Sequence, residues 1–158
     1  FNYFYSVDCD SNDNIVAVGY TGASTIVAKY NSSGALQWDK KIGSISGFSF
    51  NDIKIDSNDD IIAVGTAMVT SSDRDGFIVK YNSSGTLLWD RKLDGSLLDY
   101  FYGVGLDSNN DIIAFGTTEF AGAGGVDYMI AKVPSNGSGT GIYGGLSYQS
   151  AGFSSVSA

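Results

Sequence analysis

Three stretches of the chain begin with alternating apolar and other residues and continue into a run that is apolar at nearly every position. The alternation places Val7 and Cys9 on one side of the first stretch, and the same spacing returns at residues 53 and 55 and at residues 104 and 106. An apolar period of two predicts a β-strand. The runs that follow, "NIVAVG", "DIIAVG" and "DIIAFG", predict strands covered on both faces, because a strand with one face in water alternates.

These stretches belong to a unit that repeats about every 50 residues. "DSNDNIVAVG" from Asp10 returns as "DSNDDIIAVG" from Asp56 and "DSNNDIIAFG" from Asp107. "KYNSSG" occurs at residues 29–34 and again at residues 80–85, and a degraded third version, "KVPSNG", begins at Lys132. Asp, Asn, Ser and Gly at these places predict tight turns between strands. Each unit therefore reads as four short strands, and such a period is typical of propeller blades.

The sequence thus predicts an all-β chain built from four-stranded antiparallel sheets. We expect one β-propeller-like domain over residues 1–158, with blades at about 4–47, 48–98 and 99–150. "FSSVSA" at residues 153–158 aligns with "FYSVDC" at residues 4–9, so a fourth blade is expected to begin there.

The repeated pattern "D-S-x-x-[ND]-[IV]-x-A-x-G … [IV]-x-K-Y-N-x-S-G-x-L-x-W" resembles the bacterial β-propeller repeat family abbreviated SBBP, in three copies of which the third is degenerate. The resemblance implies extracellular or surface repeats of this length and order, with no defined activity and no catalytic residues. The turn glycine common in that family is replaced here by Asp13, Asp59 and Asn110. Asp and Asn also adopt the left-handed backbone angles that the turn needs.

Three blades do not close a ring, because propellers have about four to eight. The chain also lacks an initiator Met and a signal peptide, which suggests a segment of something longer. Three interpretations remain open: a fragment of a longer propeller, assembly with another copy of itself, or an open, capped stack. We expect association with a second copy or with a missing part of the same propeller, because an open end leaves an apolar face in water.

Composition excludes several function classes. The net charge is −8 and the nine basic residues are scattered, so a nucleic-acid partner is not expected. No apolar run approaches the ~20 residues that span a bilayer. The chain has no histidine and a single cysteine, Cys9, which excludes an internal disulfide and His-based catalytic or zinc sites within it. We therefore expect no enzyme activity and no cofactor.

The aspartate turns match the first half of a calcium loop at Asp10, Asn12 and Asn14. The second half fails, since the sixth position is Ile and no Glu follows at the twelfth. Hairpin turns explain these residues without a metal, and no metal site is expected. Lys29, Lys80 and Lys132 recur near the turns and could pair with their aspartates.

Variation between the repeats indicates where a partner could bind. In an up-and-down blade the near-invariant turns lie at one end, while the links between strands two and three and between blades lie at the other and differ in length and content. A rigid scaffold with one variable end favours recognition there, although surface loops also vary without function. The ligand-binding candidates in these predicted loops are Met68, Ser72, Asp73, Arg74, Asp75, Leu98, Asp99, Tyr100, Glu119 and Phe120.

Three further residue types have competing roles. Trp38 and Trp89 are expected to pack between blades, with sugar stacking as the alternative. Tyr3, Tyr5, Tyr100 and Tyr102 are the better candidates for stacking on sugars. Cys9 occupies the position of Ile55 and Leu106, and we expect it to be a buried apolar residue.

Together these features predict a non-enzymatic extracellular, cell-surface or virion-surface propeller module. It would recognise a surface glycan or a protein through the variable end. The alternatives are a purely structural element of a surface or virion fibre and, less favoured, a carbohydrate-active enzyme using a carboxylate pair such as Asp73 and Asp75.

Overall fold

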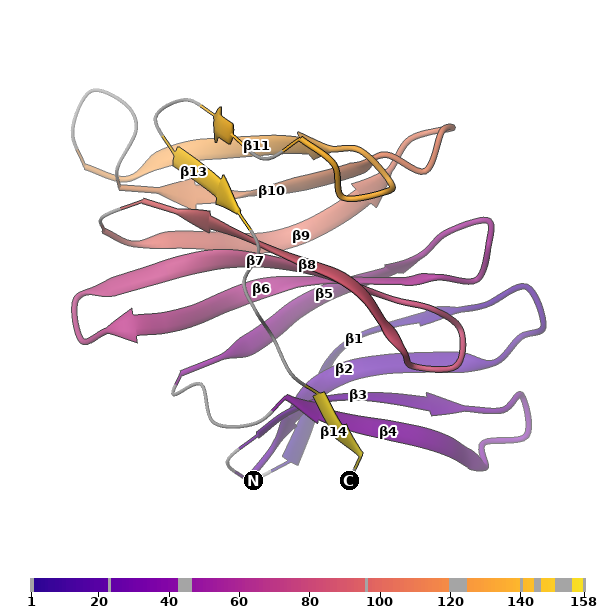
Figure 1. Cartoon of the computed structure of the whole chain (residues 1–158). Coiled ribbons are helices and arrows are strands. Elements are labelled where there is room, and N and C mark those ends of the chain that lie inside the picture. The colour runs from indigo at the N-terminus through magenta and orange to yellow at the C-terminus, as the bar shows by residue number, and fades with distance from the viewer. Residues whose placement is uncertain are drawn as a thin grey trace.

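The computed structural model describes residues 2–22, 24–42, 47–95, 97–119, 125–139, 141–143, 146–149 and 155–157. Within these residues every regular element is a β-strand, and the strands form three antiparallel sheets (Figure 1). The expectation of an all-β chain is therefore confirmed.

The first repeat folds as a four-stranded meander of strands β1 (Asn2–Cys9), β2 (Ile15–Thr21), β3 (Ser24–Tyr30) and β4 (Leu36–Ile42). The second repeat forms the same arrangement from β5 (Ser49–Ile55), β6 (Ile61–Thr70), β7 (Asp73–Tyr81) and β8 (Leu87–Asp94). We call these the first and second sheets. Neighbouring strands pair in sequence order, because each is joined to the next by a short hairpin turn.

The third repeat departs from this pattern. It contributes a three-stranded third sheet of β9 (Asp99–Leu106), β10 (Ile112–Thr118) and β11 (Asp127–Val133). The tail then leaves this sheet: β12 (Gly141–Tyr143) pairs with β13 (Leu146–Gln149), which joins the outer edge of β8. The third repeat lacks the "LxWDxK" segment that forms β4 and β8, so no strand covers the edge of β11 within the described residues.

The last strand, β14 (Ser155–Ser157), pairs antiparallel with β4 at the outer edge of the first sheet (Figure 1). Residues 153, 154 and 158 of the expected fourth repeat lie outside the described part of the chain. The start of a fourth blade there stays a prediction, and the tail residues that the structure describes reinforce the outer edges of the first two sheets.

The three sheets stack face to face in sequence order. β5 packs on β1 and β2, and β9 packs on β5, β6 and β7 (Figure 1). The face of each sheet that points toward the next sheet along the chain is called its forward face, and the opposite face its rear face. The second sheet is covered on both faces, which explains why β6 and β7 are buried along most of their length.

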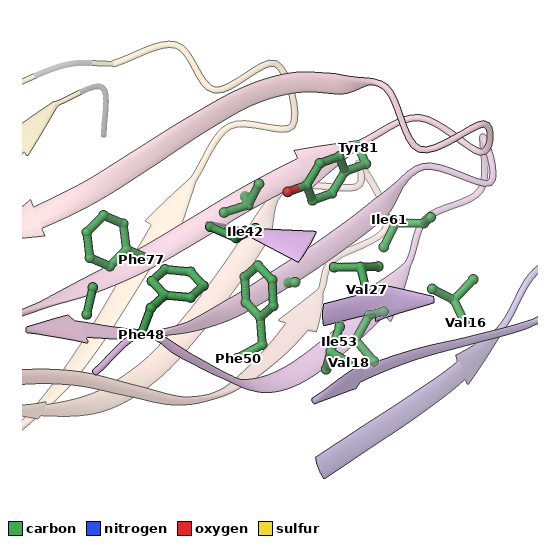
Figure 2. Packing of buried hydrophobic residues seen from close by; sticks show 13 residues of the cluster. Val16, Val18, Val27, Ile42, Phe48, Phe50, Ile53, Ile61, Phe77 and Tyr81 are labelled. Atoms are coloured by element: carbon green, nitrogen blue, oxygen red, sulfur yellow. The ribbon is translucent and has the colours of Figure 1, made fainter. Parts of the chain in front are cut away.

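The first junction is an apolar cluster between the first and second sheets. Val16, Val18 and Val27 on the forward face of the first sheet meet Ile61 and other apolar residues on the rear face of the second (Figure 2). Three phenylalanine rings close this cluster at one side: Phe48 stands edge-on to Phe50 at 5.0 Å and to Phe77 at 5.6 Å between ring centroids. Edge-to-face rings add to the area buried.

The second junction, between the second and third sheets, uses the equivalent positions of the next repeat. Ile62, Val64 and Ile78 hold the forward positions of Val16, Val18 and Val27, and they meet the rear face of the third sheet at Ile112 and Ala114. Alternate residues of one strand thus belong to different junctions, which accounts for the unbroken apolar runs in the sequence.

The glycine that ends each apolar run has a specific steric role. The first strand of each sheet carries a β-bulge, or register shift, opposite this glycine. A Cβ on Gly65 would lie 1.9 Å from the carbonyl oxygen of Ser49, and one on Gly116 would lie 1.7 Å from that of Tyr100. The bulged backbone therefore approaches a position that only glycine leaves open.

We predict that Gly65→Ala destabilises the fold by about 3 kcal/mol, because a backbone oxygen cannot move aside as a side chain can. Gly105 is the matched control, since a Cβ there meets nothing within 4 Å. Gly105→Ala should change the free energy of unfolding by less than about 0.5 kcal/mol. Urea denaturation of both variants measures the difference, and equal midpoints would contradict this steric account.

Candidate functional site

The turns of the constant end hold their own aspartates. Asp10 Oδ1 accepts the backbone N–H groups of Asn12 and Asn14, both at 2.9 Å. The same bonds form in the second and third turns. The φ angles of Asp13, Asp59 and Asn110 are 60°, 61° and 62°. The expectation that Asp and Asn adopt left-handed angles here is confirmed.

Each turn also pairs with a lysine from the third strand of its own sheet. The Nζ atoms of Lys29, Lys80 and Lys132 lie 2.7, 2.8 and 2.6 Å from carboxylate oxygens of Asp10, Asp56 and Asp107, as the sequence suggested. Burial opposes ionisation of Asp10, but the Lys29 ammonium and the turn N–H groups outweigh it and lower its pKa well below the usual range. Within the described residues no group of three or more Cys, Asp or Glu side chains is arranged to hold a metal ion.

The variable end is dominated by a hairpin where the sequence predicted a loop. β6 and β7 extend until Thr70 pairs with Asp73, so only residues 71–72 form the turn. Met68, Arg74 and Asp75 therefore lie in strands. Thr, Val and Met favour strands, and their register with β7 outweighs the loop-like Ser and Asp composition that guided the prediction.

A continuous surface forms around this hairpin. The Arg74 N–H donates to the Leu97 carbonyl at 3.1 Å, and the Glu119 N–H donates to the Leu98 carbonyl at 3.1 Å. The link between the second and third sheets thereby ties the hairpin to the end of β10. The partly or fully exposed candidates that meet here define what we call the hairpin surface: Met68, Ser72, Arg74, Leu98 and Glu119.

Three of the predicted ligand residues are aspartates that lie in or beneath this surface, and each has a carboxylate oxygen that accepts no hydrogen bond from the described residues. Asp75 and Asp99 are fully buried, and Asp73 is partly exposed. Asp75 Oδ2 lies 3.0 Å from Lys92 Nζ, and Asp99 Oδ2 accepts the Gly95 N–H at 3.0 Å. One buried oxygen of each of the three has no hydrogen-bond partner among the described residues. Asp75 and Asp99 are therefore supporting residues rather than exposed loop residues.

Burial controls the protonation of these acids. Desolvation raises the pKa of Asp75 to about 6, although the Lys92 ammonium partly offsets it. Desolvation also raises the pKa of Asp99, against the hydrogen bonds from Thr118 and Gly95. Lys92 bridges Asp75 and Asp94, at 3.0 and 2.8 Å.

The remaining candidates are placed as follows. Tyr100 lies on β9, where its ring stacks on that of Tyr102 with centroids 6.0 Å apart and planes 9° apart. The rings of Tyr3 and Tyr5 lie side by side, with their centroids 6.1 Å apart. Phe120 lies outside the described residues.

A concave region elsewhere on the molecule was not predicted from the sequence. It is a hollow of about 280 Å³ on the first sheet, lined by Asn2, Tyr3, Phe4, Tyr20, Thr21, Ile26 and Tyr30. Phe4, Ile26 and Tyr30 occupy the repeat positions of Phe50, Phe77 and Tyr81, which are core residues of the first junction. Comparison of the repeats shows why: these three residues hold positions that are core in the second sheet, but within the described part of the chain no sheet covers them.

The structure also tests the expected burial of Cys9 and the expected packing of the two tryptophans. Cys9 is exposed, so its expected burial was wrong. Its repeat counterpart Ile55 packs against the first junction, whereas no sheet of the described residues covers the rear face of the first sheet. The packing role of the tryptophans is confirmed, because Trp38 lies against the first cluster and Trp89 against the second.

Comparison with protein-family models and with curated proteins found no match. The resemblance to SBBP repeats therefore stays a prediction carried by the motifs alone. The part of the chain that the structure describes contains no helix long and apolar enough to span a membrane.

We predict that stability falls as pH rises from about 4 to about 6. The folded pKa of Asp75, about 6, lies above its usual value of 3.8, so the folded state binds the extra proton in this window. The shift of about 2 pKa units corresponds to roughly 3 kcal/mol. Asp75→Asn should reduce this fall in thermal unfolding between pH 4 and 7, and the raised pKa of Asp99 should account for the remainder. In Asp107→Asn the fall should persist, because the pKa of Asp107 is lowered and acts only below pH 4; a flat wild-type profile would contradict the assignment.

We also predict that Lys80→Ala destabilises the fold by about 3 kcal/mol, because it leaves the buried Asp56 carboxylate unpaired. Only 6% of the Lys80 side chain and none of that of Asp56 is exposed. Lys54 is the control, since 46% of its side chain is exposed and its Nζ lies 3.8 Å from Asp8 Oδ2. Lys54→Ala should cost less than about 1 kcal/mol in the same denaturation experiment; similar losses in both variants would refute the burial argument.

Proposed function

We propose that the three sheets are successive blades of a propeller-type repeat, and that the chain is a non-enzymatic recognition module. Its partner is a surface carbohydrate or a protein that binds at the hairpin surface. Stacking of the sheets in sequence order and their shared strand topology support the blade assignment. The acidic, Gly-, Ser- and Asn-rich composition is consistent with an extracellular, cell-surface or virion-surface setting.

One observation carries this proposal: residues that differ between the repeats come together in a single surface. Backbone hydrogen bonds join Arg74 to Leu97 and Glu119 to Leu98, so the surface spans the second and third sheets. At the opposite end the turn carboxylates bind their own N–H groups and lysines. The repeated turn carboxylates are therefore occupied within the chain, which favours the variable end for recognition of a ligand.

The composition of the hairpin surface suits polar recognition. Arg74 supplies a planar guanidinium, Glu119 a carboxylate, and Met68 and Leu98 apolar area between them. Such a mixture is typical of protein interfaces, and guanidinium and carboxylate groups also hydrogen-bond sugar hydroxyls. The Arg74 guanidinium is oriented by the Gly47 carbonyl, 3.3 Å from Nη1, which limits its rotamers before a partner binds.

The surroundings of the acids support a role without catalysis. A glycosidase needs two carboxyl groups that reach the scissile bond. Asp75 has no exposed surface and is bound by Lys92, so it offers a sugar no contact. The less favoured enzyme hypothesis therefore loses one member of its suggested pair.

A structural assembly role is the second candidate, and the uncovered outer faces of the first and third sheets favour it. Exposed apolar residues are concentrated there, among them Phe4, Val7, Phe115 and Ile130. The two roles are compatible, because the hairpin surface and these faces involve different residues.

A glycan array probed with the wild-type chain and two variants tests the recognition proposal. We expect Arg74→Ala to reduce binding to the recognised glycan at least tenfold, because a charge-assisted hydrogen bond is lost. Lys54→Ala removes one positive charge away from the hairpin surface and should bind as the wild type does. Equal binding by all three proteins would place the site elsewhere, and no binding to any glycan would leave a protein partner as the only form of the proposal.

A further inference from the structure

The two internal junctions share a set of polar contacts as well as apolar ones. At the first, Ser11 donates its N–H and hydroxyl to the two carboxylate oxygens of Asp59, at 2.8 and 2.7 Å. At the second, Ser57 and Asn110 make the corresponding pair, with Asn110 Nδ2 donating to Ser57 Oγ at 2.7 Å. The serine of one turn thus binds the left-handed residue of the next.

A lysine contact recurs in the same way. Lys29 Nζ donates to the Ser83 carbonyl at 3.2 Å, and Lys80 Nζ donates to the Ser135 carbonyl at 3.3 Å. Each lysine therefore binds the turn aspartate of its own sheet and a backbone oxygen of the next sheet. Both are almost fully buried by that next sheet.

The third sheet presents this set of groups on its forward face without a neighbour. Ile130 stands at the position of Val27 and Ile78, and it is 77% exposed whereas Ile78 is 1% exposed. The Lys132 side chain is 55% exposed, against 6% for Lys80. Ser108 holds the position of Ser11 and Ser57.

The rear face of the first sheet presents the complementary groups. Phe4 and Val7 stand at the positions of Phe50 and Ile53, which are fully buried, yet both are more than half exposed. Asp13 holds the position of Asp59 and Asn110, and Ser32 that of Ser83 and Ser135. The counterparts of the groups that bind the serine and the lysine of the preceding sheet are therefore present.

The two faces also correspond in shape at one position where the third sheet departs from the repeat. At the second junction Gly76 admits the Phe101 ring, which would lie 2.8 Å from a Cβ at that position. The third sheet has Tyr128 there instead, and its side chain is 97% exposed. The counterpart of Phe101 in the first sheet is Phe4, which lines the 280 Å³ hollow. A projecting ring on one face thus corresponds to a cavity on the other.

We propose that the forward face of the third sheet binds the rear face of the first sheet of a second copy of this chain. Tyr128 enters the aromatic hollow, Lys132 donates to the Ser32 carbonyl, and Ser108 binds the Asp13 carboxylate. The interface is heterologous, so it propagates until the ring closes. Two copies supply six sheets, within the four to eight of propellers, whereas three would supply nine.

Head-to-tail association of two copies fits these faces better than association through two identical faces. Pairing of two forward faces would place a projecting Tyr128 ring on both sides of the interface, whereas the aromatic hollow lies on the rear face of the first sheet. The described strands of the tail leave both faces free, because β13 and β14 lie at the outer edges of β8 and β4. The inference does not depend on the hairpin surface, which lies outside this interface.

The first experiment combines solution mass with the reactivity of Cys9, the only thiol. Cys9 is exposed on the rear face of the first sheet, where its counterpart Ile55 is packed against the preceding sheet. We expect twice the mass of one chain by sedimentation, and at least tenfold slower reaction of Cys9 with a soluble disulfide reagent than after dilution to the monomer. A monomer with reactive Cys9 at all concentrations would overturn the proposal.

Two aspartate variants locate the interface. Tyr128→Asp should give a monomer with a reactive Cys9, and its high exposure means that the fold of one chain is not affected. Leu88→Asp is the control, because Leu88 is also exposed but lies on β8, away from both faces. A dimer that persists in Tyr128→Asp, or is lost equally in Leu88→Asp, would refute the assigned face.

A disulfide tests the pairing directly. At the first junction Asp8 Oδ2 accepts the Ile55 N–H at 3.0 Å, and the repeat counterparts of these residues are Gly105 and, in the second copy, Cys9. Gly105→Cys should therefore form disulfide-linked dimers under mild oxidation through Cys9 of the other copy. Ser71→Cys, at the exposed hairpin tip, and Gly105→Cys combined with Cys9→Ser should not. Absence of the cross-link, or links between like positions only, would overturn the head-to-tail arrangement.

Discussion

The fold depends on one constraint: each sheet is apolar on both faces, so its stability depends on the neighbouring sheets that cover them. A lone antiparallel sheet can leave one face in water, but the strands of this chain place aliphatic side chains on both. Burial of about 25 cal/mol per Å² of apolar surface therefore becomes available at the junctions rather than within a sheet. The stability of the second sheet, which has two junctions, should exceed that of its neighbours.

This constraint also explains why polar residues repeat. A junction fixes the offset between neighbouring sheets only if directional contacts accompany the apolar ones, because apolar packing alone tolerates sliding. The bonds from Ser11 to Asp59 and from Lys29 to the Ser83 carbonyl supply that direction at the constant end. The left-handed turn residue has two functions there, since it closes its own hairpin and accepts the serine of the preceding sheet. Asp or Asn meets both needs, whereas glycine would meet only the first.

The sequence predicted the features that depend on position within a repeat and missed those that depend on what covers the repeat. Strand order in the first two repeats, turn conformation and the lysine–aspartate pairs follow from local pattern, and they were predicted correctly; the expected fourth strand of the third sheet was not found among the described residues. Cys9 and Ile55 have the same place in their strands, yet one is exposed and the other packed, because only the second has a neighbouring sheet. The burial of Asp75 and Asp99 was missed for a related reason: Asp in a variable segment reads as loop, and the pairing of β6 with β7 that buries Asp75 is a long-range effect.

The two ends of the sheets differ in how their charges are satisfied, and this difference bears on function. At the constant end the acids accept two or three hydrogen bonds and pair with lysines, so their charge stabilises the fold. At the variable end Asp73, Asp75 and Asp99 keep buried oxygens without partners, which costs stability at neutral pH. Asp75 and Asp99 bind Lys92 and the Gly95 N–H through their other oxygens, so they support this end of the fold while one oxygen of each stays without a partner among the described residues. Groups that lower stability in this way concentrate at functional sites, so their position in and beneath the hairpin surface, rather than at the well-bonded end, favours the variable end as the place where this scaffold acts.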